Sequence, residues 1–225
     1  MATDDAKRAP GRPSDPAKRE ALLEAARELL LERGPDVPME AIAAKAGVSK
    51  ATLYARFADR KALVEAVLRR ESDRTITDEQ AAESLSMDFE AALIAYGERY
   101  LAFINDRQMS GWDRLISAMA ISHPEEARRF FDLGPGRRQS HLTAIIQNGI
   151  DRGQAHAASA SEAAGDLVGL WLGFTGIEVN LLARAPLSAD EIHHRVVRGV
   201  GLFMCLHGPS GLDVEAVKVA HTGKG

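Results

Sequence analysis

The side chains best suited to chemistry in this 225-residue sequence are hydrogen-bond donors and cations, which gather just after Gly47. The stretch SKATLYAR at 49–56 offers hydroxyl, ammonium, phenol and guanidinium groups, and Arg60 and Lys61 follow. Such groups bind phosphates and the edges of nucleic-acid bases. Catalysis finds no comparable support, because GxGxxG, P-loop and GxSxG motifs are missing and the seven histidines lack metal-ligand spacing. We therefore expect a protein that is not an enzyme and uses no metal or cofactor.

The charge of the chain is uneven. Residues 1–70 carry 14 Lys and Arg against 11 Asp and Glu, a net charge of +3, whereas the remainder carries −7. Within 6–19, five cations face a single acid, Asp15. This distribution favours contact of only the N-terminal part with a polyanion, although a solvated tail would have the same composition.

The sequence also indicates a compartment. A single cysteine, Cys205, excludes an internal disulfide and fits a reducing environment. The longest uncharged apolar run, 167–177, is far shorter than the ~20 residues that span a bilayer, and the N-terminus has no apolar run. We expect a cytoplasmic protein without a membrane partner.

Apolar residues recur at helical spacing along almost the whole chain, and neither strand-like alternation nor an internal repeat interrupts them. Asp15 with Pro16, and the serines Ser49 and Ser159, are typical helix starts, and either Ser188 or Asp190 begins the last helix. The expected fold class is all-α. The predicted helices cover about 15–33, 38–46, 50–57, 60 to the early 80s, 89–104, 111–121, 122–133, 137–152, 161–184 and 189–206.

The stretch from Met39 to Leu68 predicts a helix-turn-helix. Ile42 and Ala43 give a short helix an apolar seam, and Ala46-Gly47-Val48 forms a turn in which Gly47 can adopt a left-handed conformation. Ser49 then caps a second short helix, whose outward face carries Lys50, Thr52, Ala55 and Arg56. Two short helices at a steep angle allow the second to enter a major groove of DNA.

The sequence AGVSKATLYARFADRKAL, within a region from about Ala17 to Thr77, resembles the DNA-binding domain of the TetR (tetracycline repressor) family of transcriptional regulators. The resemblance implies a three-helix DNA-binding domain joined by a fourth helix to a C-terminal helical bundle for effector binding and dimerisation. The expected parts are a basic, disordered arm at 1–14, a DNA-binding domain at 15–77 with its helix-turn-helix at about 38–57, an effector and dimerisation domain at 78–208, and a tail at 209–225.

Positions within the motif imply roles on a double-stranded operator. Lys50, Ala51, Thr52 and Ala55 are expected to meet base edges. The residues expected at phosphates are Ser49, Tyr54, Arg56, Arg60 and Lys61, and Arg12 is expected at phosphates or a flanking minor groove. One departure from the family pattern is Val37-Pro38, where relatives often have a hydroxyl that contacts phosphate. Ala55 and Arg56 also differ from the aromatic residue and histidine common there, so the operator sequence cannot be taken from relatives.

One module reads too few bases for a unique site, so the motif predicts a homodimer on a pseudo-palindromic operator. The resemblance places the dimer interface in the last two long helices. On an unbroken helix over 161–184, one narrow face would carry Gly165, Gly169, Gly173 and Gly176. That face could meet a partner helix, leave room for an effector, or pack within the subunit; we expect the first, together with Val196, Val200 and Phe203.

Effector contacts are expected from the larger side chains of the middle helices, although aromatic residues at helical spacing also form ordinary cores. The candidates are Tyr96, Tyr100, Phe103, Trp112, Met119, His123, Trp171 and Phe174. No charged cluster marks this region, which favours a small, mainly apolar effector. The expected function is a ligand-responsive repressor. The alternatives are an activator or architectural factor without effector response, and a ligand-binding or enzymatic helical protein with a vestigial DNA module.

Overall fold

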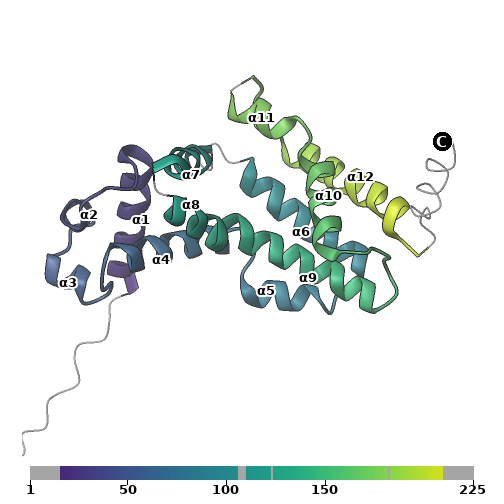
Figure 1. Cartoon of the computed structure of the whole chain (residues 1–225), viewed down its shortest axis with the longest axis horizontal. Helices are drawn as coiled ribbons and strands as arrows, with labels where there is room; N and C mark the ends of the chain where they lie inside the picture. The colour runs from purple at the N-terminus through teal and green to yellow at the C-terminus, as the bar shows by residue number, and fades with distance from the viewer. Residues whose placement is uncertain (1–15, 106–109, 123, 182, 210–225) are drawn as a thin grey trace, which may run out of the picture. The chain divides into compact units, whose positions relative to one another are not determined.

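The computed structural model describes residues 16–105, 110–122, 124–181 and 183–209, and every regular element within these ranges is helical (Figure 1). The all-α fold class is thereby confirmed. The chain forms two compact units, one ending at Val67 and the other beginning at Leu68. The expected arm at 1–14, including Arg12, lies outside the described residues, as does nearly all of the tail.

The first unit contains α1 (Pro16–Arg33), α2 (Met39–Lys45), α3 (Lys50–Tyr54) and the start of α4 (Arg60–Asp73). Its core is made of aliphatic side chains from all four helices, including Leu22, Ile42, Leu53 and Leu63. Two glycines with positive φ separate the first three helices: Gly34 at +86° and Gly47 at +65°. Because L residues with side chains avoid this conformation, these glycines determine where α1 and the α2–α3 turn end.

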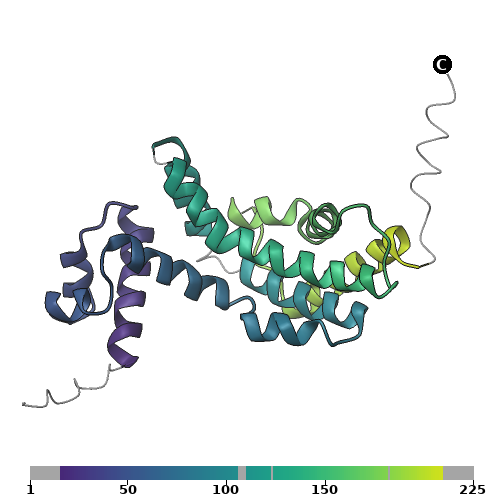
Figure 2. The ribbon, with the colours of Figure 1, turned by 60° about the horizontal axis from the view of Figure 1, so that its bottom comes forward.

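The second unit holds the end of α4 and the remaining helices. These are α5 (Asp78–Ser84), α6 (Phe89–Ile104), α7 (Ser110–Ser122), α8 (Pro124–Phe131), the π-helical η1 (Asp132–Gly136), α9 (Arg137–Asp151), α10 (Ala160–Leu172), α11 (Thr175–Asn180) and α12 (Ala189–His207). Helix α10 packs against α9 and α12, and α6 packs against α9 and α12, so these four helices enclose the main core (Figures 1 and 2).

Three predicted helices have different bounds in the structure. The helix expected from 60 to the early 80s ends at Asp73, because Thr77 and Gln80 form a capping box that starts α5. The break expected at Gly134-Pro135-Gly136 is a π-helical turn that joins α8 to α9; this wider turn accommodates a proline that lacks an amide proton. The helix expected over 161–184 ends at Leu172, because Gly173 has φ +46° and ψ −138°.

Trp171 of α10 is the largest fully buried side chain among the described residues of the second unit. It is 0% exposed, and its Nε1 donates to the Val196 carbonyl at 3.3 Å. A Cβ atom on Gly97 of α6 would lie 2.7 Å from Trp171 Cζ2, and one on Gly199 of α12 would lie 2.5 Å from Cδ1. The indole therefore occupies a space that exists only because both neighbouring helices have glycine there.

Candidate nucleic-acid interface and ligand cavity

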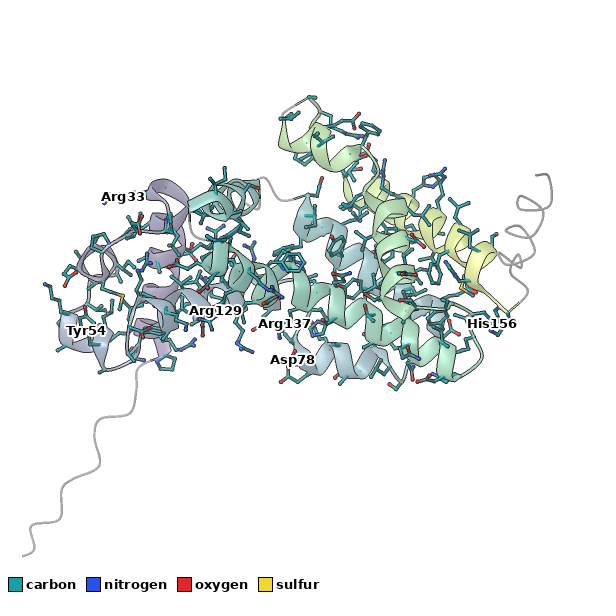
Figure 3. All side chains as sticks on the ribbon, in the orientation of Figure 1. Arg33, Tyr54, Asp78, Arg129, Arg137 and His156 are labelled. Atoms are coloured by element: carbon teal, nitrogen blue, oxygen red, sulfur yellow. The ribbon has the colours of Figure 1, made fainter. Side chains whose placement is uncertain are left out.

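The exposed surface of α3 brings together most of the predicted DNA contacts. Ser49 caps the helix by accepting from the Thr52 amide at 3.1 Å, which holds the short α3 at the end of its turn. Leu53 is fully buried, and this orients the opposite side of the helix outwards. The exposed residues are Ser49, Lys50, Ala51, Tyr54 and Ala55, with Thr52 and Arg56 partly exposed. Tyr54 lies at the outer end of α3 and is 48% exposed (Figure 3). The arrangement can place donors and small side chains against a base-pair edge.

Lys50 forms an ion pair with Glu40 of α2 at 3.2 Å. The pKa of the Glu40 carboxyl is below its ordinary value, chiefly because the carboxylate accepts from its own backbone amide, and also because of Lys50. Exposed ion pairs of this kind are weak, so a base acceptor can replace the carboxylate. Glu40 therefore positions the Lys50 ammonium at the start of α3 and leaves it able to donate to a base.

Arg60 has a structural partner that the sequence did not indicate. Its guanidinium donates to the Pro35 carbonyl and lies 3.6 Å from Asp36, so it joins the loop after α1 to the start of α4. At the same place Asp59 Oδ1 accepts from the Ala62 amide at 2.7 Å. The contact of this helix start with a phosphate stays a prediction, although the Asp59 carboxylate already accepts from one of its amides. Lys61 remains exposed.

One cation near α3 was missed by sequence reasoning. The Arg19 guanidinium lies 5.8 Å from the centre of the Phe57 ring, which brings a positive charge of α1 close to the loop between α3 and α4. No spacing rule connects positions 19 and 57, so only the fold could reveal this pair. Pro38 is the N-cap residue of α2 and makes no side-chain cap hydrogen bond.

A cavity opens in the second unit between α4, α6, α7, α8, η1 and α9. Its empty volume is about 470 Å³, the open mouth included. Its lining is Leu68, Glu71, Phe103, Ile104, Trp112, Ile116, Phe130, Gly134, Pro135 and Arg138. Phe103 and Trp112 were predicted as effector contacts. Phe130 of α8, Glu71 of α4 and Arg138 of α9 were missed, because no spacing pattern in the sequence links them to Phe103 and Trp112.

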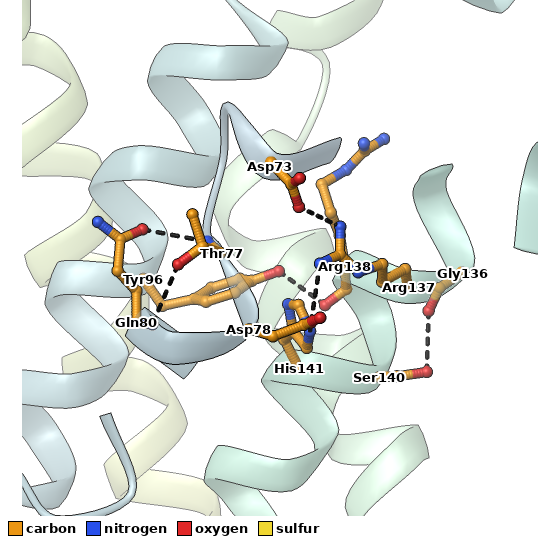
Figure 4. Close-up of polar contacts among 10 residues, drawn as sticks. All are labelled: Asp73, Thr77, Asp78, Gln80, Tyr96, Gly136, Arg137, Arg138, Ser140 and His141. Carbon is orange, nitrogen blue, oxygen red and sulfur yellow. Dashed lines mark hydrogen bonds and ion pairs between the residues drawn. The ribbon is translucent and has the colours of Figure 1, made fainter. Parts of the chain in front are cut away.

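Two of the lining residues are buried and charged. Arg138 is 7% exposed, and its guanidinium lies 4.7 Å from the centre of the Phe103 ring. Glu71 is 4% exposed and pairs with Arg74 at 3.1 Å. The Tyr96 hydroxyl donates to the Arg138 carbonyl at 2.7 Å, and burial raises the pKa of this phenol well above its ordinary value (Figure 4). The expectation of a mainly apolar effector rested on the absence of a charged cluster in the sequence. The fold brings the charges of Glu71 and Arg138 to the cavity, so its wall is not purely apolar.

The other effector candidates lie elsewhere. Tyr96 is buried in the main core, where it stacks with Tyr100 and Trp171 at ring separations of 6.1 and 6.4 Å. Trp171 also borders a second hollow of about 260 Å³, together with Gly176. Phe174 is wrong as a cavity residue, because it is 82% exposed. His123 and the side chain of Met119 lie outside the described part of the chain.

An ion-pair cluster beside the cavity contains a histidine (Figure 4). Arg137 donates to Asp73 at 2.5 Å and to Asp78 at 2.7 Å, and His141 Nε2 lies 3.2 Å from Asp78. Burial and the Arg137 charge lower the pKa of His141, against the raising effect of Asp78. The pKa of Asp78 is lowered, mainly by Arg137.

The cluster predicts a pH dependence of stability. Since the pKa of His141 is lower in the folded protein, the unfolded chain binds the proton more readily, and stability is lost as pH falls below about 6.5. The His141→Gln variant should lack this part of the loss between pH 7.5 and 5.5, measured by urea unfolding. An equally steep loss in the variant would show that other groups cause it.

The residues exposed on α10 and α12 are not all those expected at the dimer interface. Gly165 and Gly169 are exposed, and an added Cβ would meet no atom within 4 Å at either position. Gly173 ends α10 instead of extending its face, and Gly176 belongs to α11. Val196, Val200 and Phe203 are wrong as interface residues, because they are buried in the core of their own subunit. The exposed apolar residues nearby are Phe174, Ile177 and Leu181 on or next to α11, and Val197, Leu202 and Leu206 on α12.

Arg195 explains how α10 ends. Its guanidinium donates to the carbonyls of Trp171 and Leu172, both at 3.1 Å, and so satisfies two groups that lose their helical partners at Gly173.

No helix in the described ranges is long and apolar enough to cross a bilayer.

Both units of the chain match families of known proteins. Residues 22–67 match the family described as bacterial regulatory proteins, tetR family, and residues 91–209 match the AefR-like transcriptional repressor, C-terminal domain. The HTH-type transcriptional regulator YdeS of Bacillus subtilis (strain 168) is 30% identical over 193 residues, which cover 84% of this chain and 88% of YdeS.

Solved structures are similar over nearly their whole length. A TetR-family transcriptional regulator from Mesorhizobium loti MAFF303099 is 25% identical with a TM-score of 0.71, covering 88% of this chain and 99% of its own. The flavonoid-responsive regulator FrrA is 26% identical with a TM-score of 0.68, covering 87% of this chain and 99% of its own.

Proposed function

The chain belongs to the TetR family of bacterial transcriptional regulators, and from this membership we propose that it is a homodimeric repressor released from a pseudo-palindromic operator by a small effector. Members of the family bind DNA and regulate transcription. The observation that carries the proposal is the outward face of α3, where Lys50, Thr52 and Tyr54 lie together over a buried Leu53.

The proposed dimer forms through α10 and α12. Gly165 and Gly169 leave space for the close approach of a second helix, and the exposed Val197, Leu202 and Leu206 supply apolar area. Two subunits present two copies of α3, which doubles the number of bases read and makes the site palindromic. The proposed effector occupies the cavity around Phe103 and Trp112.

A footprint on the DNA upstream of the protein's own gene tests the function. We expect two protected half-sites, with affinity that falls steeply as salt rises because phosphate contacts release counterions. Absence of salt-sensitive binding would contradict the proposal. Binding that persists against every candidate effector would favour an activator or architectural factor instead.

Substitutions on α3 should separate base readout from phosphate contact. Lys50→Ala is expected to cost about 1–3 kcal/mol at the cognate site and to relax preference at particular base pairs. Tyr54→Ala should weaken cognate and scrambled DNA by the same factor, since a phosphate contact carries no sequence information. Lys45→Ala is the control for lost charge, because Lys45 pairs with Glu28 and Glu32 on α1 at 2.6 and 3.6 Å. Equal losses on both DNAs for Lys50→Ala would contradict its readout role.

A further inference from the structure

We propose that the cavity binds an uncharged planar aromatic molecule bearing a carbonyl oxygen, which accepts a hydrogen bond from the Trp112 indole. This inference rests on the proposed role of the cavity as the effector site and names the class of ligand that the site takes.

Trp112 supplies the first argument. It lines the cavity, it is 4% exposed, and its Nε1 has no hydrogen-bond partner among the side chains and backbone that the structure describes. An indole N–H can only donate, and a buried donor without an acceptor destabilises the protein. A ligand oxygen would satisfy this group.

The walls determine the shape of the ligand. The Trp112 and Phe130 rings lie 6.4 Å apart with their planes at 46°, and Phe103 lies under the Arg138 guanidinium. Aromatic faces and edges pack well against a flat ring system. Gly134 and Pro135 of the π-helical turn form a wall with little side chain, which leaves space beside the rings.

The buried charges argue for a neutral ligand. Glu71 and Arg138 both line the cavity, so an anionic ligand would meet a carboxylate and a cationic ligand would meet a guanidinium. Either ionic ligand would therefore meet a buried charge of its own sign in the wall, which costs free energy. An uncharged molecule avoids both penalties.

Three naphthalenes substituted at the same ring carbon test the class: acetylnaphthalene has the carbonyl, ethylnaphthalene lacks it, and naphthoate carries a negative charge. Binding to the full-length protein is followed by calorimetry. We expect acetylnaphthalene to bind about tenfold more tightly than ethylnaphthalene, the size of effect that one buried hydrogen bond produces. Naphthoate should bind more weakly than either neutral compound.

Variants identify the groups responsible. Trp112→Phe keeps the ring but removes the donor, and should bring the two neutral compounds to equal affinity. Glu71→Gln should improve naphthoate selectively, and gives a second test if Trp112→Phe folds poorly. Phe130→Leu is the matched control: it alters the same wall without touching the donor, and should change both neutral compounds by the same factor.

Several results would overturn the inference. These are tightest binding of naphthoate by the wild-type protein, an unchanged preference for the carbonyl in Trp112→Phe, or no binding of any of the three probes. Operator release is measured separately. Selective binding without release would support the ligand site while contradicting the effector part of the proposed function.

Discussion

Replacing Trp171 by alanine is expected to reduce the free energy of unfolding by about 3–5 kcal/mol, the range for large aromatic residues removed from a core. The indole is fully buried, stacks with Tyr96, contacts the tilted ring of Tyr100, and donates to the Val196 carbonyl. The ring lies between α6 and α12, which pack against each other and so fix the size of the space that it fills. Removing the ring therefore leaves a cavity as well as losing its contacts.

Urea unfolding followed by circular dichroism measures this loss. Phe131→Ala is the control, since this aromatic side chain is about half exposed and should cost much less. A second variant tests whether the indole needs glycine at position 199. Gly199→Ala should destabilise the wild-type protein, because its Cβ would lie 2.5 Å from the indole, but should be tolerated once Trp171 is alanine. Additive losses in the double variant would contradict the proposed fit.

The local parts of the fold were predictable from sequence. Ser49, Ser159 and Ser188 each accept from the amide three residues later, as expected of helix caps, and α3, α10 and α12 begin where these caps predict. The turn glycine at 47 adopts positive φ for the same local reason. Such features depend on a few neighbouring residues, so the sequence contains all the information they need.

The contacts between distant residues were not predictable. Trp171 was a candidate for effector binding because nothing in the sequence connects it to Gly97 and Gly199. Gly173 has the same spacing as Gly165 and Gly169, yet it adopts a positive φ and ends the helix, and Arg195 from another helix caps the released carbonyls. The cavity combines residues of six elements, so its two charges became neighbours only in the folded chain.

The α3 surface combines features that the sequence predicts with contacts that it does not. Its exposed residues followed from the capping serine and the buried leucine, and so could be assigned in advance. The ion pair of Lys50 with Glu40 and the use of Arg60 at Pro35 depend on how α2 and the loop before it pack. Sequence therefore identified which groups face outwards, whereas the structure determined which of them already have partners.

The second large effect is expected for Gly169→Leu, which should give a monomer with operator affinity reduced by orders of magnitude, since two linked half-sites are replaced by one. Within the subunit the change should be harmless. Gly169 is exposed, a Cβ added there would meet no atom within 4 Å, and leucine is a better helix former than glycine. A defect in this variant would therefore report on association and not on folding.

Light scattering and sedimentation measure the oligomeric state of Gly169→Leu, and a mobility-shift assay measures operator binding. Ala144→Leu is the matched control, because it adds the same side chain at an exposed position of α9, outside the α10–α12 surface. Thermal unfolding of the monomer should show an intact second unit. A Gly169→Leu protein that stays dimeric and binds operator normally would place the interface elsewhere. The open glycine face would then be an ordinary solvated surface, and the exposed apolar residues of α11 and α12 would need another partner.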